Sequence, residues 1–434
     1  TQIGNAPIRQ IDGQDGLGRH LWLEQVQKAR LNLNEYTYQA FMNPYLKNEP
    51  GSIPTKTAMD ATSNVKSEDV FRKDDAIDVA PNWKLVWWRF KKHRLALVSG
   101  VIFIVIALIS VFPDFFSTRN PHKTSATKSF MPVQGIHFFE NGNFNPHIEK
   151  LVGKRNSKTL KMEWKAHETQ KIPIEFFVEG YYYKILGMIE TNIHFLGVSD
   201  PKSRQTIHLL GTDRLGRDQW SRLMHGTRVS LSIGLVAVIL SVFFGILLGG
   251  ISGYYGGWAD LIIQRLIEIL QSLPPIPIWM ALTASLPRDW SVEQTYFAIT
   301  IILSMIGWTT LAREVRGRFL SMREEDFVMA AHLSGCSQMR IIFRHMLPTF
   351  TSHIIATSTL AVPVMIINET FLSFLGLGLR PPAISWGVLL QEAQNLQSIA
   401  LAPWLLLPGL AVIITVLALN ILGDGLRDAA DPYS

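Results

Sequence analysis

The segment VSLSIGLVAVILSVFFGILLGGISGYYGGWA, residues 229–259, contains no Asp, Glu, Lys or Arg in 31 consecutive positions. The hydrocarbon core of a bilayer is about 30 Å thick, and roughly 20 apolar helical residues cross it. This segment is therefore long enough to span a membrane. Residues 393–423 form a second uncharged run of 31 positions. The two runs together predict a polytopic membrane protein.

The average composition hides this feature. Of 434 residues, 47% are hydrophobic, a value that ordinary globular proteins share. Charged residues make up 18% of the chain, below the roughly 25% of soluble domains. A collagen, a coiled coil or a disordered tail does not fit these values. The single cysteine, Cys336, excludes an intramolecular disulfide and a multi-cysteine metal site. The first apolar run begins at Leu95, so we expect no cleavable secretory signal.

Six stretches qualify as membrane spans, and they are residues 95–116, 229–250, 261–286, 295–311, 348–372 and 400–422. The second is expected to begin after Arg222 and Arg228, because each arginine near the bilayer centre costs about 3 kcal/mol. The third contains Pro274, Pro275 and Pro277. Three prolines predict a kinked helix that lines a cavity, with plain helix packing as the alternative.

The distribution of Lys and Arg predicts the orientation. If the N-terminus is cytoplasmic, the short inside segments carry thirteen Lys and Arg residues. The short outside loops then carry two, Arg288 and Arg380. Cytoplasmic loops are enriched in basic residues, so this bias places both termini in the cytoplasm. The Lys-rich connection after the first span is long, and long segments cross the membrane largely regardless of charge.

The predicted fold class is an all-α polytopic membrane protein with six transmembrane helices and a small, partly β extracytoplasmic domain. Its expected parts are a cytoplasmic extension (1–83, with one helix near 20–41), the first span with its basic flank (84–116), an external insert (117–227), a core of five helices (228–428) and a short tail (429–434). In the insert, residues 172–183 have the pattern of a strand, a Gly turn and a second strand.

Residues that would make the chain an enzyme are missing from the sequence. His167 begins a stretch that is similar to a zinc helix, but Lys171 stands where the second histidine belongs. Gly153-Lys154 lacks the remainder of a phosphate-binding loop. We therefore predict no catalytic residue and no metal site. Two carboxylates near span ends, Glu268 and Glu369, are candidate functional groups, with snorkelling or a structural hydrogen bond as the alternative.

The loop at residues 321–347, between the fourth and fifth spans, is the most informative segment. Acidic residues Glu324, Glu325 and Asp326 favour a helix N-terminus, where the dipole attracts negative charge. The helix is expected to end near Gly335, and a second short helix over residues 337–347 would follow. Ala330 and Ala331 make one side small, which suits a docking helix but also ordinary packing.

This loop resembles the coupling loop of permeases in binding-protein-dependent ABC importers. The matching residues are Ala330, Ala331, Gly335, Ile341 or Ile342, Leu347 and Pro348. Four further segments, residues 209–218, 253–260, 372–378 and 423–428, resemble hallmarks of the dipeptide/oligopeptide branch of that family. Together with the coupling loop they span most of the second half of the chain in order, so chance similarity is a poor explanation.

The resemblance implies a type I importer core in the bacterial cytoplasmic (inner) membrane. The implied partners are membrane lipid, a second homologous permease, two ATPase subunits that bind ATP and Mg, and an external substrate-binding protein, with no nucleic acid. The residues implied in ATPase coupling are Glu325, Asp326, Met329, Ala330, Ala331 and Gly335. The family glutamate falls at Met329, so its polar contact does not carry over, and Glu325 or Asp326 is the alternative.

The resemblance favours oligopeptides as cargo, with oligosaccharides or another solute as alternatives in the same architecture. Candidate residues of the substrate path are Pro274, Pro275, Pro277, Pro363 and Glu369. A self-sufficient secondary transporter is the main rival, but no inverted repeat and no mid-span charge pair is evident in the sequence. A membrane-anchored receptor fits poorly, because it needs one or two spans rather than six.

Overall fold

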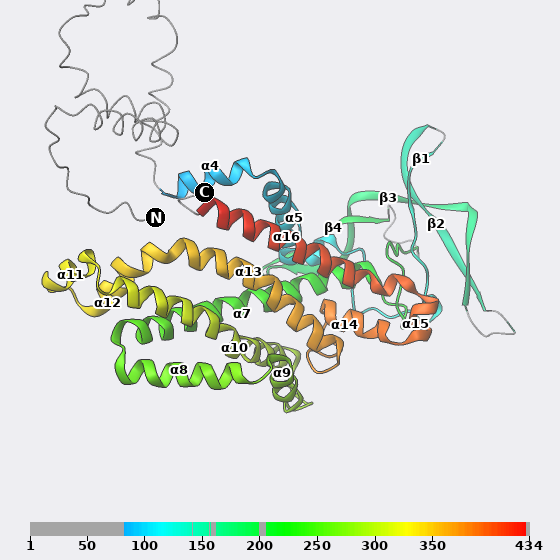
Figure 1. Ribbon diagram of the computed structural model, residues 1–434. Helices are drawn as coiled ribbons and strands as arrows, with labels where there is room; N and C mark the ends of the chain where they lie inside the picture. Colours follow the sequence, from blue (N-terminus) through cyan, green and yellow to red (C-terminus); the bar gives the residue numbers. More distant parts are fainter. Residues whose placement is uncertain (1–81, 141, 156, 158–161, 199–204, 431–434) are drawn as a thin grey trace, which may run out of the picture. The chain divides into compact units, whose positions relative to one another are not determined.

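The computed structural model describes residues 82–430 apart from residues 141, 156, 158–161 and 199–204 (Figure 1). The helix expected near residues 20–41 lies outside the described residues. The longer helices are α4 (Asn82–Lys92), α5 (Arg94–Val111), α7 (Gln219–Tyr255), α8 (Gly257–Ser272), α9 (Pro275–Ala284), α10 (Val292–Met322), α13 (Leu347–Phe374) and α16 (Leu407–Ala430). Shorter helices are α6 (Pro113–Phe116), η3 (Ala126–Lys128), α11 (Asp326–Leu333), α12 (Gln338–Arg340), η4 (Ile341–Met346), α14 (Trp386–Gln391), η5 (Glu392–Gln394), α15 (Leu396–Leu401) and η6 (Pro403–Leu406).

The long helices confirm the predicted polytopic membrane fold. Among the described residues, five helical segments are long and apolar enough to cross a membrane: α5, α7, α10, α12 through α13, and η6 through α16. Helices α8 and α9 together give a sixth candidate. Helix α7 begins at Gln219, so the last nine residues of the predicted insert, 219–227, are helical. Arg222 and Arg228 thus lie within α7, ahead of its uncharged stretch.

The third predicted span is broken rather than kinked. Helix α8 ends at Ser272, α9 begins at Pro275, and the two axes meet at 87°. Proline lacks an N–H donor, and its fixed φ suits the first turn of a helix. Pro274 is the N-cap of α9 and Pro275 its first residue, so the prolines begin a new helix.

Close helix packing explains several glycines of the core. Helices α7 and α10 run parallel, and a Cβ on Gly249 would lie 2.5 Å from the Ala312 carbonyl oxygen. Helix α13 runs antiparallel to α7, with Gly234 against Ile366. Helices α5 and α16 pack together where a Cβ on Gly425 would meet the Ala96 methyl at 2.3 Å. Small residues of this kind let membrane helices approach closely.

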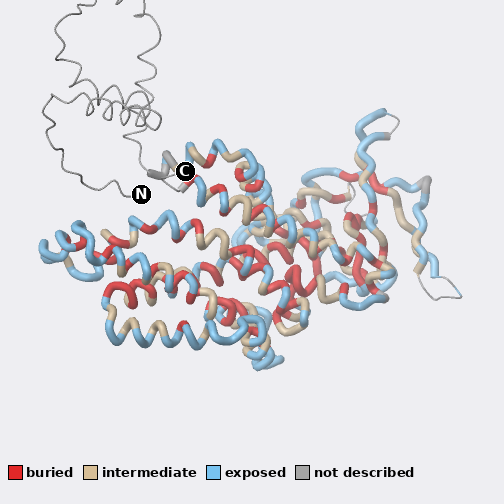
Figure 2. Tube along the Cα trace, in the orientation of Figure 1, coloured by how far each residue is buried: buried red, intermediate tan, exposed pale blue. Residues whose placement is uncertain are grey.

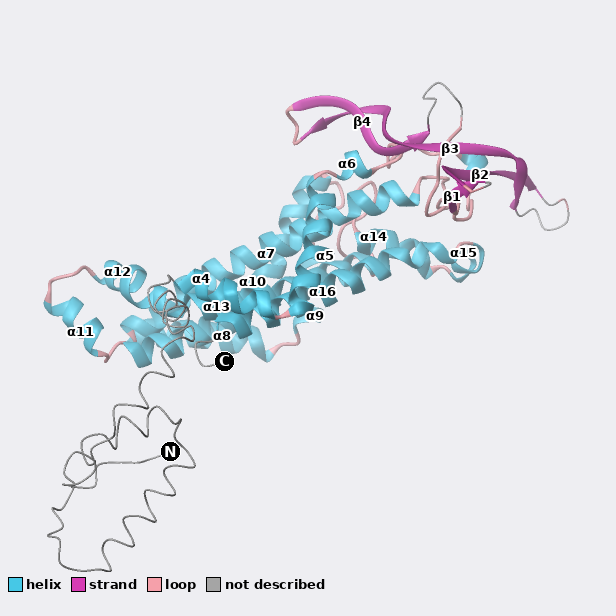
Figure 3. Cartoon of the chain, turned by 90° about the horizontal axis from the view of Figure 1, so that it is seen from above, coloured by secondary structure: helices cyan, strands magenta, loops and turns pink. Residues whose placement is uncertain are grey.

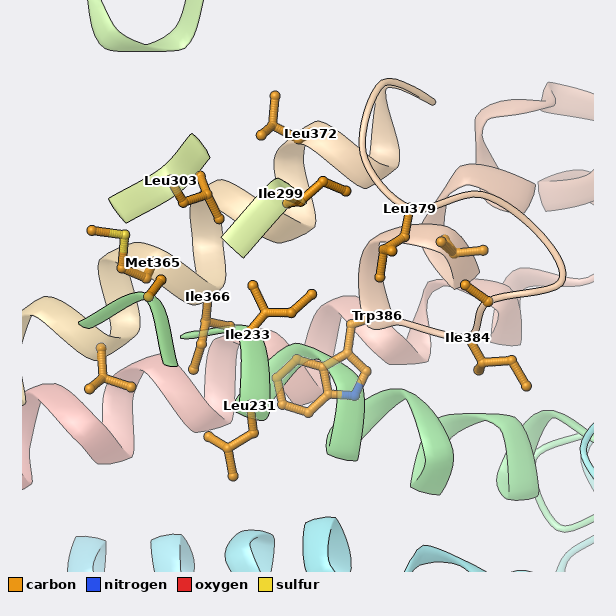
Figure 4. Packing of buried hydrophobic residues seen from close by; sticks show 14 of the residues in the cluster. Leu231, Ile233, Ile299, Leu303, Met365, Ile366, Leu372, Leu379, Ile384 and Trp386 are labelled. Carbon is orange, nitrogen blue, oxygen red and sulfur yellow. The ribbon is translucent and has the colours of Figure 1, made fainter. Parts of the chain in front are cut away.

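The apolar core lies where α7, α10, α13 and α14 meet. The indole of Trp386, which is 1% exposed, packs there with a layer of aliphatic residues from all four helices (Figure 4). By contrast, α8 shows a largely exposed face along its length (Figure 2). Ile262 and Ile269 on that helix are each 62% exposed. Apart from the exposed Arg265–Glu268 pair, this face is largely apolar, and apolar surface of this kind is covered by lipid or by another protein.

Four strands form one antiparallel sheet in the order β1-β2-β3-β4, which confirms the predicted β domain (Figure 3). The strands are β1 (Ile136–Glu140), β2 (Asn143–Arg155), β3 (Met162–Ile185) and β4 (Ile189–Val198). The turn predicted within residues 172–183 is wrong, because β3 continues through it and turns at Leu186-Gly187, where φ is positive. Gly180 instead makes room for a neighbour: a Cβ there would lie 2.3 Å from the His194 ring.

Aromatic rings join the sheet to the end of the first membrane helix. Phe195 of β4 lies 5.9 Å from the ring of Phe115 and 5.7 Å from that of Phe116 in α6. Trp220 of α7 donates its indole N–H to the Phe116 carbonyl oxygen at 2.8 Å. The sheet is therefore fixed to the helices at the end where α5 stops and α7 starts. Helices α11 and α12 lie at the opposite end (Figure 3).

Candidate functional site

Helices α11 and α12, residues 326–340, form what we call the α11–α12 corner. Glu325 is the N-cap of α11 and Asp326 lies in its first turn, as the acidic cluster predicts. The helix ends at Leu333, and Gly335 follows with φ +76°, its N–H donating to the His332 carbonyl oxygen at 3.0 Å. The second predicted helix, 337–347, is different: α12 lasts three residues and continues as the π-helical η4 into α13.

The inner side of the corner is anchored in the helix bundle. Val328 and Ala331 are 3% and 8% exposed. They pack in one cluster with Ile341 and Met346 of η4 and with Phe319 of α10. The same cluster includes residues at the ends of α7 and α13. A displacement of the corner therefore acts on the ends of three membrane helices.

The outer side of the corner presents apolar side chains to its surroundings. Phe327, Met329 and Leu333 are 37%, 57% and 88% exposed. Ala330 is also exposed whereas Ala331 is buried, so the two alanines do not form one small face. The exposed residues Met339 and Phe343 follow in α12 and η4. We call Met329 and Leu333, which lie one turn apart on α11, the apolar face of the corner. Apolar groups gathered on a surface indicate a docking site.

The structure does not bring the predicted path residues together. Pro274, Pro275 and Pro277 are exposed at the break between α8 and α9, whereas Pro363 is buried inside α13. Glu369 is fully buried, and its carboxylate accepts hydrogen bonds from Ser230 at 3.0 Å and from Ser373 at 2.8 Å.

These contacts favour the structural interpretation of Glu369. The Ser230 hydroxyl also accepts a hydrogen bond from the Trp386 backbone, so the carboxylate links α7, α13 and α14. Glu268, the other candidate carboxylate, is half exposed and pairs with Arg265 at 2.7 Å on the same helix. Neither carboxylate therefore stands free at the lining of a cavity.

A small cavity that the sequence reasoning missed lies between α7, α10 and α13. Its volume is about 100 Å³. The polar lining residues are Ser241, Thr310, Glu314, Thr357 and Ser358. At its edge, His353 and Glu314 lie 3.0 Å apart. The spacing of Gly307, Thr310 and Glu314 places them on one face of α10, which is the sequence signal that would have found it. Ionisable groups within membrane helices are uncommon and often functional.

At the other end of the bundle, buried ions form an extensive network. Asp213 and Arg222 are 0% and 1% exposed, and Arg222 Nη1 lies 2.5 Å from Asp213 Oδ2. Arg217 also binds Asp213, and both arginines contact Glu392. The network ties the loop before α7 to the segment after α14. The sequence reasoning missed it, although Asp213 and Arg217 lie within the segment quoted above for its family resemblance.

A second buried group lies beside it. The His208 Nδ1 atom is 2.9 Å from Asp218 Oδ1, and both side chains are fully buried. The Ser221 hydroxyl donates to Asp218 Oδ2 at 2.6 Å. Burial raises the pKa of Asp218, but the hydrogen bonds and charge of His208 and the hydrogen bonds of Ser221 outweigh it and lower that pKa. We call Asp213, Arg217, Arg222 and Glu392, with His208, Asp218 and Ser221, the external junction.

None of these groups is arranged as a metal centre. Within the described parts of the chain, no cluster of three or more His, Cys, Asp or Glu side chains is placed to hold a metal ion. The carboxylates of the external junction already bind arginine, histidine or serine. The arrangement supports fixed structure at this end and an accessible apolar surface at the other.

Two models of known protein families match parts of this chain. The family model described as a binding-protein-dependent transport system inner membrane component matches residues 245–433. That of the N-terminal transmembrane domain of oligopeptide transport permease C matches residues 82–132.

Several bacterial proteins are similar over about half of the chain. A putative peptide permease of Brucella suis biovar 1 is 40% identical over 226 residues, which cover 52% of this chain and 73% of that protein. The oligopeptide transport system permease protein OppC of Bacillus subtilis is 37% identical over 240 residues, 55% of this chain and 75% of that one. A dipeptide transport system permease protein of Alkalihalophilus pseudofirmus is 41% identical over 226 residues, with 52% and 72% covered.

Proposed function

From the premise that this chain belongs to the family of binding-protein-dependent transport inner membrane components, we propose that it is the permease subunit of an ATP-driven peptide importer. A permease subunit of this family is a multi-pass inner-membrane protein and not itself an enzyme. The single observation that supports coupling to an ATPase is the α11–α12 corner. The outer side of the corner is exposed and apolar, and its inner side packs against three membrane helices.

The proposed orientation places the corner in the cytoplasm. Helices α7 and α10 run parallel, α13 runs back, and the C-terminal end of α16 lies against the start of α5. The described N-terminal and C-terminal helices therefore end on the same side as the corner. The thirteen-to-two excess of Lys and Arg on this side supports its assignment to the cytoplasm. The sheet and the external junction then face outward.

In this arrangement, two ATPase subunits dock beneath the membrane, and they bind the ATP and Mg. One of them receives the apolar face of the corner of this chain. When the ATPases close, the corner moves as a rigid unit because Val328 and Ala331 fix it to η4 and α10. The motion reaches α10 and α13, which line the small cavity beside Glu314 and His353. A second homologous permease supplies the opposite wall of the path.

Peptides are the proposed cargo because the similar proteins carry peptide, oligopeptide and dipeptide in their names. An external binding protein would deliver them to the side that bears the sheet. The proline residues Pro274, Pro275 and Pro277 remain candidates for the path, because they are exposed at a broken helix. Oligosaccharides or another solute are the alternative cargo for the same architecture.

The experiment is mild detergent extraction of the tagged chain from its native membrane, with mass spectrometry of the proteins that accompany it. We expect a second permease and ATPase subunits. Purified complex in vesicles, with the binding protein added, should then take up a labelled peptide only when ATP is present. A chain that purifies alone and moves solute without ATP would instead be a self-sufficient transporter, and the proposal would be wrong.

A further inference from the structure

A cavity with a volume of about 860 Å³ lies outside the helix bundle. One wall is the linker after the first membrane helix, residues 118–123. The other wall is formed by residues 178–181 of β3 and 194–198 of β4, and residues 205–207 complete the lining. Pockets that bind small molecules have volumes of about 300–1,000 Å³. This cavity therefore has room for a ligand of a few residues.

The two walls differ in charge. Arg119, His122 and Lys123 line the linker wall, whereas the sheet wall presents Glu179 and Tyr181. Arg119 is half-buried, and its Nη1 atom has no hydrogen-bond partner among the residues that the structure describes. Buried donors are paired in the great majority of cases. Nη1 itself is covered by protein, so it is the charge of Arg119, together with those of His122 and Lys123, that makes the linker wall attractive to an anionic group.

A neighbouring lysine supports an excess of positive charge on this side. Lys128 donates to the hydroxyl of Thr206, which also lines the cavity. Burial and then the nearby charge of Arg119 lower the pKa of Lys128 to about 8, and Asp218 only partly opposes them. The local cations repel one another, and an anionic group in the cavity would relieve that repulsion.

The sheet wall is rigidly held. His194 lies with Nδ1 2.8 Å from the Asp114 carbonyl oxygen and Nε2 3.0 Å from the Tyr181 carbonyl oxygen. The Tyr181 hydroxyl donates to Asp114 Oδ1 at 3.1 Å. Asp114 lies in α6, directly after the first membrane helix, so the wall is fixed to the bundle. A preformed wall lowers the entropy that a ligand loses on binding.

We propose that this cavity binds a short zwitterionic peptide, with its terminal carboxylate at Arg119 and Lys123 and its ammonium on the wall of Glu179 and Tyr181. The choice of a peptide rests on the proposed function, whereas the need for opposite charges rests on the two walls. The site would hold cargo outside the membrane path, next to the helix ends through which the cargo enters.

The test uses the full chain in nanodiscs of uncharged phosphatidylcholine, without binding protein or ATPases. The probe is a tripeptide with free termini and a neutral fluorophore on its middle side chain, and binding is followed by fluorescence anisotropy. Bidentate and charge-assisted bonds to a carboxylate are strong, so amidation of the C-terminus should weaken binding by about tenfold or more.

The variants Lys123→Ala and Arg119→Gln should weaken binding of the free-acid peptide by a similar factor. They should leave binding of the amidated peptide unchanged. Lys123 is exposed, so its replacement leaves the fold intact. Arg214→Gln, at an exposed arginine that does not line the cavity, is the matched control and should bind like the unchanged chain. Equal binding of acid and amide, or equal loss in the control, would overturn the inference.

Two more measurements separate this inference from the proposed function and from a lipid site. If anionic phosphatidylglycerol in the nanodisc displaces the peptide, the cavity is a headgroup site and the inference is wrong. Peptide uptake by the whole importer is measured in parallel. Uptake by the unchanged chain with no binding in nanodiscs would overturn the cavity assignment alone. Binding in the cavity, with no ATP-driven uptake by a complete complex, would overturn the proposed function alone.

Discussion

The two ends of the helix bundle are built in opposite ways. At the external junction, Asp213, Arg222 and Asp218 are buried, and each is bound by a partner of opposite charge or by a hydroxyl. At the α11–α12 corner, the apolar side chains of Met329 and Leu333 are more than half exposed. The junction therefore depends on all of its partners being present, whereas the corner leaves part of its surface available.

This difference indicates which end moves. A buried ion pair holds its elements in one geometry, since separating the charges leaves each of them without water or a partner. The corner is attached to η4 and α10 by buried apolar contacts of Val328 and Ala331, so it moves together with those helix ends. A rigid end beside the sheet and a corner that moves with the helix ends suit the proposed permease, in which the energy source would lie on the side of the corner.

The largest expected effect comes from breaking the junction with Arg222→Ala. Removing one member of a buried ion pair typically costs about 3–5 kcal/mol. Arg217 still pairs with Asp213 and Glu392 in this variant, so we expect a loss near the lower end of that range. The free energy of unfolding should still fall strongly, because Asp213 and Glu392 stay in place without Arg222. The measurement is the amount of protein in the membrane together with its thermal unfolding midpoint in detergent.

The control is Arg265→Ala, which removes the partner of Glu268. That pair is 70% and 52% exposed on the surface of α8, and exposed pairs contribute about 0–1 kcal/mol. Its yield and unfolding midpoint should stay close to those of the unchanged chain. Similar losses in both variants would mean that the Asp213–Arg222 pair has no special role.

The second expected effect is the loss of docking in Leu333→Asp. Leu333 is 88% exposed, so the substitution leaves the fold and the membrane content unchanged. If the apolar face enters an ATPase groove, a carboxylate there would be buried without a partner at a cost of several kcal/mol. We expect the ATPase subunits to stop co-purifying and ATP-driven uptake to disappear.

Met188→Asp is the matched control for this substitution. Met188 is 86% exposed in the turn between β3 and β4, at the opposite end of the molecule. It should keep the ATPase subunits bound. Normal uptake by the Leu333 variant would show that the corner takes no part in coupling. The two ends of the bundle would then differ in structure but not in function.

The sequence predicted the parts of the fold that depend on local pattern. The uncharged run at residues 229–259 lies largely within α7 and continues into α8, and the acidic cluster with Gly335 predicted both ends of α11. Periodicity, caps and apolar length are local properties. They identify an element without any knowledge of what it packs against.

Features that depend on distant residues were not predictable. Arg222 and Glu392 are 170 positions apart, and nothing in either neighbourhood specifies the other. Gly180 suggested a turn, but its cause is the ring of His194 on the next strand. The cavity walls around Arg119 and Glu179 likewise meet only after β3 and β4 pack beside the linker.

A smaller effect is expected for Gly335→Val at the end of α11. The glycine has φ +76°, and placing a residue with a Cβ in this conformation costs about 1–2 kcal/mol. A Cβ there would meet no atom within 4 Å, so the cost comes from backbone strain alone. We expect normal membrane content with reduced uptake per ATP hydrolysed. Gly335→Asn, which tolerates positive φ, should retain most of the coupling, and equal loss in both would contradict the backbone explanation.

The smallest effect is expected for Met329→Glu, which restores the acidic residue of the family motif. Met329 is 57% exposed and lies near the start of α11, where a glutamate is compatible with the helix dipole, so stability should change by less than about 0.5 kcal/mol. Because Leu333, one turn along the helix from Met329, is apolar and exposed, the docking partner should also be apolar at this position. We therefore expect coupled uptake to fall roughly twofold, an effect of about 0.5 kcal/mol, while Met329→Leu keeps it. A rise in uptake would show that the partner presents a cation, and that the corner, like the external junction, binds through charge.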